Sequence, residues 1–144
     1  MIVYMDTSAL VKRYLHEADS EKVIALLSDP DHLFGSSVVT KVEISAAFQK
    51  GVRMNVIPST MVAEIWRDFL DHWQVFTRLR VTAGTIERAS DIAWKYGLRG
   101  YDSLHLAAAL LWQEALDASV VFAAFDHDLL QASQQAGLEP WTVS

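Results

Sequence analysis

The sequence predicts a three-layer α/β/α domain, in which helices cover both faces of a central, mainly parallel sheet of four to five strands. The first observation is that short, apolar, β-prone runs alternate with longer amphipathic segments along the chain. Strands separated by helices favour a parallel sheet, because parallel neighbours need a crossover connection. The second observation is that 144 residues, 51% hydrophobic and 21% charged, suit one globular domain spanning 1–144. The third is that the chain has no internal repeat, low-complexity tract or linker.

The N-terminal segment predicts a strand followed by two helices. Residues 2–5 are short, apolar and β-prone, and Thr7 or Ser8 is available to cap the helix that follows. A second helix begins near Asp19, and Pro30 stops it.

The middle of the chain predicts a buried strand at 33–39 and then two helices. Thr40 and Glu43 have the spacing of a capping box, and Gly51 is a natural terminator for this helix. Pro58 opens a strongly amphipathic segment. Apolar residues recur along it at three- and four-residue spacing: Met61, Val62, Ile65, Phe69 and Trp73.

The second half of the chain continues the alternation of strands and helices. The expected elements are a strand at 75–80, a helix at 82–97, a very apolar helix opened by Asp102, a strand at 119–124, a helix capped by Asp126 and ended at Gly137, and a short strand at 141–143. This order places helices between successive strands and supports the layered architecture.

Four acidic residues occupy equivalent places in this pattern. Asp6, Glu43 and Asp126 each follow a β-like run, at or inside the first turn of a helix, and Asp102 opens a helix after the turn RGY. The carboxyl ends of parallel strands face one crevice, where ligands bind. We therefore expect the four side chains to converge, although each Asp by itself could also be a helix cap and Glu43 suits the third position of a capping box.

Converging carboxylates need a partner of opposite charge. Two unit charges about 4 Å apart repel by roughly 4 kcal/mol at an effective dielectric near 20. Four acids make several such pairs, and their sum rivals the ~5–15 kcal/mol net stability of a domain. The acids must be partly protonated, spread apart or bound to a cation. Oxygen ligands in a chain without cysteine suit Mg²⁺ or Mn²⁺, and such an ion activates water for phosphodiester hydrolysis.

Composition and missing motifs exclude several other classes. The chain has no cysteine, which excludes disulfide scaffolds, thiolate zinc sites and a cysteine nucleophile. It has no apolar run of the ~20 residues that a membrane span needs, and no signal-peptide pattern, so we expect a soluble, cytoplasmic protein. The net charge of −6 is weak evidence against a nucleic-acid partner. Phosphate-loop, dinucleotide and nucleophile-elbow motifs are absent, and Ser8 stands where a haloacid-dehalogenase-type phosphatase needs its second Asp.

The segments around these acids resemble a known family. MDTSALVKRYL, TKVEISAA, LRGYDSLHLAAALL and FAAFDHDLL, in this order and spacing, resemble the four acidic motifs of the PIN domain, specifically of the small VapC-type toxins. The resemblance spans residues 2 to about 132, and YDSLHLAAAL is its most distinctive part.

The resemblance implies a Mg²⁺- or Mn²⁺-dependent endoribonuclease of a toxin–antitoxin module. Asp6 and Asp102 would be metal ligands, Asp126 would bind the metal directly or through water, and Glu43 would position or deprotonate the attacking water. Such proteins usually dimerise and are silenced by a cognate VapB-type antitoxin. The resemblance therefore implies an RNA substrate, an antitoxin partner and a homodimer, with no membrane.

Further residues are assigned supporting roles. Thr7 and Ser8 resemble the hydroxyl residues that orient the first acid. Ala124 departs from the Ser or Thr often found two places before the fourth acid. Asp128 is an auxiliary candidate, expected to point to a different side of its helix. Lys12, Arg13 and Arg99 are weak candidates for RNA phosphate contacts.

Two alternatives stay open at this level. His105 follows Asp102 by three residues and shares its helix face, yet its apolar neighbours favour a packed, hydrogen-bonded histidine over a metal ligand. The other alternative is a PIN-like binding module that keeps the four acids without cutting RNA.

Overall fold

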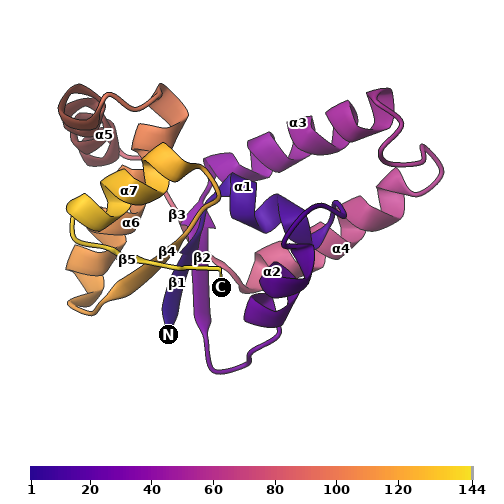
Figure 1. Cartoon of the computed structure of the whole chain (residues 1–144), viewed down its shortest axis with the longest axis horizontal. Coiled ribbons are helices and arrows are strands. Elements are labelled where there is room, and N and C mark those ends of the chain that lie inside the picture. Colours follow the sequence, from indigo (N-terminus) through magenta and orange to yellow (C-terminus); the bar gives the residue numbers. More distant parts are fainter. Residues whose placement is uncertain (144) are drawn as a thin grey trace.

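A five-stranded, fully parallel sheet forms the centre of the computed structural model, which describes residues 1–143 (Figure 1). The strand order is β3-β2-β1-β4-β5, so the N-terminal strand β1 lies between β2 and β4, which come from distant parts of the chain. The strands are β1 (Ile2–Met5), β2 (Leu33–Ser37), β3 (Thr77–Leu79), β4 (Val120–Ala123) and β5 (Glu139–Pro140). The sheet agrees with the predicted number and direction of strands.

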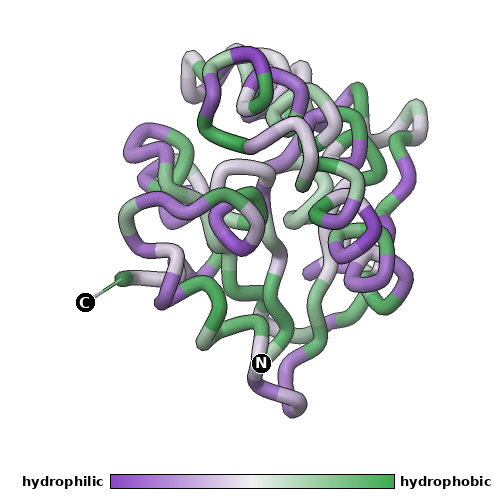
Figure 2. Tube along the Cα trace, turned by 90° about the vertical axis from the view of Figure 1, so that its right-hand side faces the viewer, coloured by the Kyte–Doolittle hydropathy of each residue, from purple (hydrophilic) through white to green (hydrophobic). Residues whose placement is uncertain are grey.

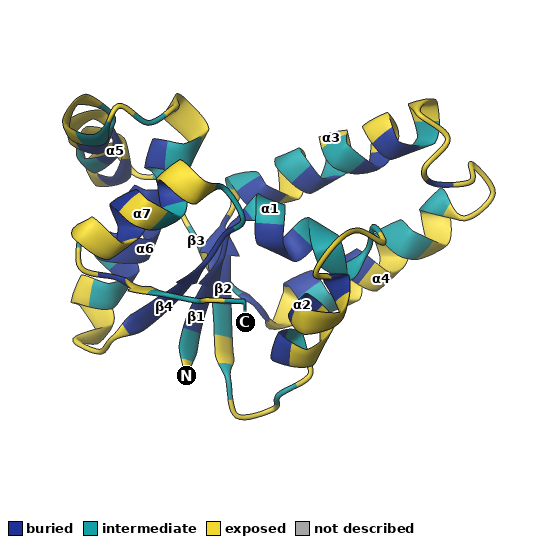
Figure 3. Ribbon diagram, in the orientation of Figure 1, coloured by how far each residue is buried: buried dark blue, intermediate teal, exposed yellow. Residues whose placement is uncertain are grey.

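Helices cover both faces of the sheet and make the expected three layers (Figures 1 and 3). The helices are α1 (Thr7–Leu10), followed by a short 3₁₀ turn (Val11–Arg13), α2 (Ser20–Leu27), α3 (Val39–Arg53), α4 (Val62–Val75), α5 (Ala83–Tyr96), α6 (Gly100–Leu116) and α7 (His127–Gln135). No helix among residues 1–143 is long and apolar enough to cross a membrane.

Each face of the sheet has its own hydrophobic core. Tyr4 of β1 and Phe122 of β4 face a core shared with α5, α6 and α7, whereas Val3 and Met5 face a core shared with α1 to α4. The alternation along β1 follows from the two-residue period of a strand. Because both faces are covered, β1 and β4 are apolar throughout, and Figure 2 shows hydrophobic segments in the middle of the molecule.

The predicted capping box on α3 is wrong. The helix begins at Val39, and its capping residue, Val38, makes no side-chain cap. The Thr40 hydroxyl is instead buried against Ser36 at 2.7 Å, and Glu43 turns toward other elements. Gly51 also does not terminate the helix, which continues to Arg53.

Other boundaries also differ from the prediction. Asp102 does not open α6, which begins at Gly100 with Arg99 at the cap position. Asp6, not Thr7 or Ser8, caps α1 through its carboxylate. Pro58 opens a turn in which Met61 N–H bonds the Pro58 carbonyl, and α4 starts only at Val62. The last strand is β5 at 139–140, just before the predicted 141–143. The helices capped by Thr82 and by Asp126 begin as predicted.

Candidate active site

The four acidic segments meet at the carboxyl edge of the sheet. Asp6 follows β1 directly, and its N–H bonds the Ala123 carbonyl of the neighbouring strand β4 at 3.0 Å. Asp126 lies just beyond β4, Glu43 lies in the second turn of α3 beyond β2, and Asp102 lies in the first turn of α6. Neighbouring parallel strands therefore bring residues from across the chain to one place.

Asp6 is the most buried of the four acids, with 4% of the residue exposed. Its Oδ1 accepts hydrogen bonds from Ser8 Oγ at 2.7 Å and from Ala9 N at 3.0 Å. Burial raises the pKa of Asp6 to about 6, and the nearby Asp102 adds to the rise, while His105 and the two hydrogen bonds act against it. The raised pKa reflects the absence of water around the charge.

Ser8 fastens the first acidic segment to the fourth. Its hydroxyl donates to Asp6 and accepts the N–H of Phe125 at 3.0 Å, one residue before Asp126. Ser8 thus contacts Asp6, as expected, whereas Thr7, expected to orient the same acid, bonds Glu43 instead. The bond between Ser8 and Phe125 also sets the start of the loop that carries Asp126.

Glu43 is held by two donors from different elements. Thr7 Oγ1 donates to its Oε1 at 2.7 Å, and His105 Nε2 lies 2.7 Å from the same oxygen. Partial burial alone would raise the pKa of Glu43, but the hydrogen bonds from His105 and Thr7 outweigh it and lower that pKa below its usual value. Glu43 is thus kept ionised beside the Asp6 segment.

His105 is buried and belongs to a hydrogen-bonded chain that reaches into the sheet. Its Nδ1 lies 2.7 Å from the hydroxyl of Tyr4, whose oxygen accepts the N–H of Ser37 at 3.2 Å. Because the Tyr4 oxygen already accepts the N–H of Ser37, the Tyr4 hydroxyl is the donor to Nδ1 of His105. The ring proton of His105 then lies on Nε2, which donates to Glu43. His105 is therefore a packed, hydrogen-bonded histidine, as its apolar neighbours indicated, and it contacts the candidate site.

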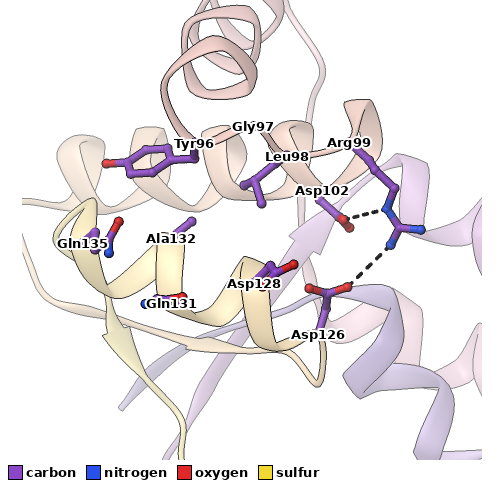
Figure 4. A pocket seen from close by; sticks show the side chains of 10 residues that line it. All are labelled: Tyr96, Gly97, Leu98, Arg99, Asp102, Asp126, Asp128, Gln131, Ala132 and Gln135. Carbon is purple, nitrogen blue, oxygen red and sulfur yellow. Dashed lines mark hydrogen bonds and ion pairs between the residues drawn. The ribbon is translucent and has the colours of Figure 1, made fainter.

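Arg99 bridges the third and fourth acids. Its Nε lies 3.2 Å from Asp102 Oδ2, and its terminal nitrogen lies 3.5 Å from Asp126 Oδ2 (Figure 4). The Arg99 side chain is 81% exposed, while that of Asp102 is 18% exposed. An arginine placed among the candidate ligands neutralises part of their negative charge in this structure.

The bridged acids open into a cavity of about 380 Å³ between α6 and α7 (Figure 4). Asp128 lines this cavity together with Asp102 and Asp126. The expectation that Asp128 points to a different side is therefore wrong. The helix begins only at His127, so Asp128 lies in its first turn, next to the cap rather than around the helix from it.

Two of the side chains predicted to contact RNA phosphate, Lys12 and Arg13, have other partners in the structure. The Lys12 ammonium lies 3.2 Å from Glu17 and 4.6 Å above the ring of Phe125. Arg13 forms a long ion pair, 3.8 Å, with Asp68 of α4. These contacts hold the 3₁₀ turn in place. Arg99 alone among the three predicted cations contacts the acids.

The donor chemistry fits a hard divalent cation. Every candidate ligand is a carboxylate, the ligand type that Mg²⁺ and Mn²⁺ prefer. The burial of Asp6 and the Arg99 bridge both indicate negative charge that a cation would stabilise. As the side chains of residues 1–143 lie, however, no three acidic or histidine groups stand close enough together to hold one ion. Asp102 and Asp126 would have to release Arg99 in order to bind a metal.

Sequence reasoning missed Tyr4 as part of this site. Tyr4 stands in a run of strand residues, IVYM, and nothing in that run distinguishes it from a core residue. The spacing of His105 three residues after Asp102 was the one usable signal, because it places both on one helix face.

A family comparison covers the segments that carry the four acids. The model of the PIN domain matches residues 3–135, which include all four acids and nearly the whole chain. The chain belongs to the PIN-domain family. The predicted resemblance to the PIN domain is thus confirmed.

Known proteins resemble this PIN domain over most of their length. Ribonuclease VapC45 of Mycobacterium tuberculosis is 32% identical over 136 residues, covering 94% of this chain and 92% of that protein. The solved structure of FitAcB from Neisseria gonorrhoeae has a TM-score of 0.65 at 16% identity, with 99% of this chain and 97% of that chain covered. VapBC2 from Rickettsia felis bound to a promoter DNA fragment has a TM-score of 0.64 at 14% identity, covering 99% and 100%. The two structures show the shared fold.

Proposed function

We propose that this PIN domain is a metal-dependent endoribonuclease, the toxin of a toxin–antitoxin module. The observation that carries the proposal is the ring of contacts that joins the four acidic segments. Ser8 links Asp6 to the Asp126 loop, and Arg99 links Asp126 to Asp102. Thr7 and His105 link the Asp6 and Asp102 segments to Glu43. The similarity to a VapC ribonuclease along nearly the whole of both chains supports the same activity.

The acids would divide the work of hydrolysis. Asp6, Asp102 and Asp126 would hold Mg²⁺, or Mn²⁺ as a substitute, which supplies a polarised water and offsets charge on the phosphate. Glu43, kept ionised by Thr7 and His105, would take the proton of the attacking water. The water oxygen would form a bond to phosphorus as the bond to the leaving ribose oxygen breaks, and the proton taken by Glu43 would return to that oxygen through solvent.

The proposal includes partners. A toxin of this kind requires a cognate VapB-type antitoxin to silence it, and we include a homodimer and a cytoplasmic location in the proposal. The support is the resemblance of the four motifs to VapC-type toxins together with the VapC relative. RNA remains the proposed substrate.

Cleavage of total cellular RNA by the purified, antitoxin-free protein tests the proposal. Reactions would contain Mg²⁺, Mn²⁺ or EDTA, and would compare the wild type with Asp102→Asn. Asp117→Asn is the matched control, because Asp117 is an exposed acid at the other end of the same helix, in a left-handed conformation that suits Asn.

The outcomes separate two functions. Discrete fragments that require metal, persist in Asp117→Asn and vanish in Asp102→Asn support the nuclease. Intact RNA in every reaction, with folded protein, would favour the non-catalytic binding module.

A further inference from the structure

The cavity beside the acids has two chemically different ends. Asp102, Asp126 and Asp128 gather at one end, with Arg99 beside them (Figure 4). The other end is lined by Tyr96, the last residue of α5, and by Gln131 and Gln135 of α7. The acidic end is used by the proposed reaction, whereas nothing in that reaction uses the neutral end.

The neutral end carries groups suited to a nucleobase. The amides of Gln131 and Gln135 each offer donors and an acceptor, and a base edge presents both kinds of group as well. A phosphate offers acceptors alone and would call for cations there. Tyr96 adds an aromatic ring, the side-chain type on which unstacked RNA bases pack. The set therefore favours a base over a phosphate.

The position and size of the cavity agree with this occupant. Its volume of about 380 Å³ lies in the range of ligand pockets, roughly 300–1,000 Å³. A second cavity of about 260 Å³ shares Tyr96 and Gln135 with the first and is also lined by Lys95. The Lys95 ammonium lies 5.4 Å from the centre of the Tyr96 ring. A strand that leaves the acids along α7 would thus pass the amides and reach a cation.

We propose that Tyr96, Gln131 and Gln135 form a base subsite, which takes one nucleobase of single-stranded RNA next to the phosphate held at the acids. The proposal rests on the proposed ribonuclease function and adds to it a source of sequence preference. The base is read by its hydrogen-bonding edge, because both glutamines present amides rather than apolar groups.

Sequencing the ends of fragments cut from a random-sequence RNA library tests the subsite. The wild type should prefer one or two bases at a single position beside the cut. Gln131→Ala and Gln135→Ala should reduce that preference at least five-fold at this position alone. Gln134→Ala is the matched control, because Gln134 is exposed on the same helix and does not line the cavity. The subsite is overturned if the wild type shows no base preference beside the cut, or if its preference is unchanged in both variants.

A binding measurement separates this inference from the proposed activity. Adenosine, guanosine, cytidine and uridine 5′-monophosphates would be titrated in EDTA into ¹⁵N-labelled protein. We expect one nucleotide to shift the side-chain amide signals of Gln131 and Gln135 more than the other three do, with Gln134 unaffected. Equal or absent shifts with all four overturn the subsite. If the wild type cuts no RNA but the amides still discriminate, the nuclease proposal fails and the base subsite stands.

Discussion

His105 Nε2 and Glu43 Oε1 lie 2.7 Å apart, although the two residues are separated by 62 positions in the chain. The contact joins α6 to α3 across the carboxyl edge of the sheet. Tyr4 fixes the other ring nitrogen from within β1. The orientation of the proposed general base is therefore set by a residue that would touch neither metal nor RNA.

Replacing His105 should shift the pH dependence of cleavage. The hydrogen bond from His105 lowers the pKa of Glu43, so its loss should raise that pKa. Because the base must be ionised, activity should begin to fall at a higher pH as the solution is acidified. The acidic limb of the pH–rate profile of His105→Leu should therefore move to higher pH. His105→Gln keeps a side-chain donor and should restore part of the shift. A change in stability with an unmoved profile would show a purely structural role.

Asp6→Asn should stabilise the metal-free protein above pH 6. The folded-state pKa of Asp6 is about 6, above its ordinary value, so the folded protein binds a proton that the unfolded chain releases. Wild-type stability should therefore fall as pH rises from 4 to 7, by up to about 3 kcal/mol from this group.

The measurement for Asp6 is urea unfolding in EDTA between pH 4 and 8. Asn keeps the capping oxygen and removes the charge, so the advantage of the variant should be greatest at pH 7–8 and vanish near pH 4. Added Mg²⁺ should stabilise the wild type and leave Asp6→Asn unaffected. A constant difference at every pH would contradict the assignment of the raised pKa to burial.

Arg99→Gln should tighten metal binding. The guanidinium of Arg99 bridges Asp102 and Asp126 and competes with a cation for the same oxygens. Because Arg99 is largely exposed, its loss should change the stability of the metal-free protein by no more than about 1 kcal/mol. Mn²⁺ binding followed by electron paramagnetic resonance should become several-fold tighter.

Arg88→Gln is the control for that experiment. Arg88 also pairs with a carboxylate, Glu114 at 2.6 Å, but it does not line the cavity that holds the acids. Its loss should leave Mn²⁺ affinity unchanged. Weaker Mn²⁺ binding in Arg99→Gln would mean that Arg99 supports the metal site rather than competing for it.

Gly35→Ala should destabilise the fold. A Cβ on Gly35 of β2 would lie 2.6 Å from the indole of Trp112 on α6, closer than atoms can pack. Overpacking of this kind costs about 1–3 kcal/mol, measurable by thermal or urea unfolding. Gly100→Ala is the control, since nothing lies within 4 Å of its added Cβ. Equal stability of both variants would contradict the close approach of α6 to the sheet.

Local sequence signals predicted most elements correctly where local contacts determine them. Thr82 caps α5 through reciprocal bonds with Thr85, and Asp126 caps α7, because such bonds connect residues three positions apart. The capping box at Thr40 and Glu43 failed for the opposite reason. Both side chains have stronger partners elsewhere: Ser36 for Thr40, and two donors for Glu43. Gly51 lies inside α3 rather than at its end, and its lack of a side chain accommodates Ile57, from which a Cβ would be 2.8 Å away.

The sequence by itself determined the layered α/β class and the positions of the four acids. Both follow from the two-residue and 3.6-residue periods and from the ends of strands, which are readable along the chain. Only the tertiary structure decided what neutralises and orients those acids: Arg99 between Asp102 and Asp126, and His105 on Glu43. Apart from the Arg99–Asp102 pair, whose residues are three apart, those contacts depend on the strand order β3-β2-β1-β4-β5 and on side-chain geometry over long separations. The spacing of residues along the chain does not reveal the strand order or this geometry, because the partners of a charged side chain are set by the tertiary fold.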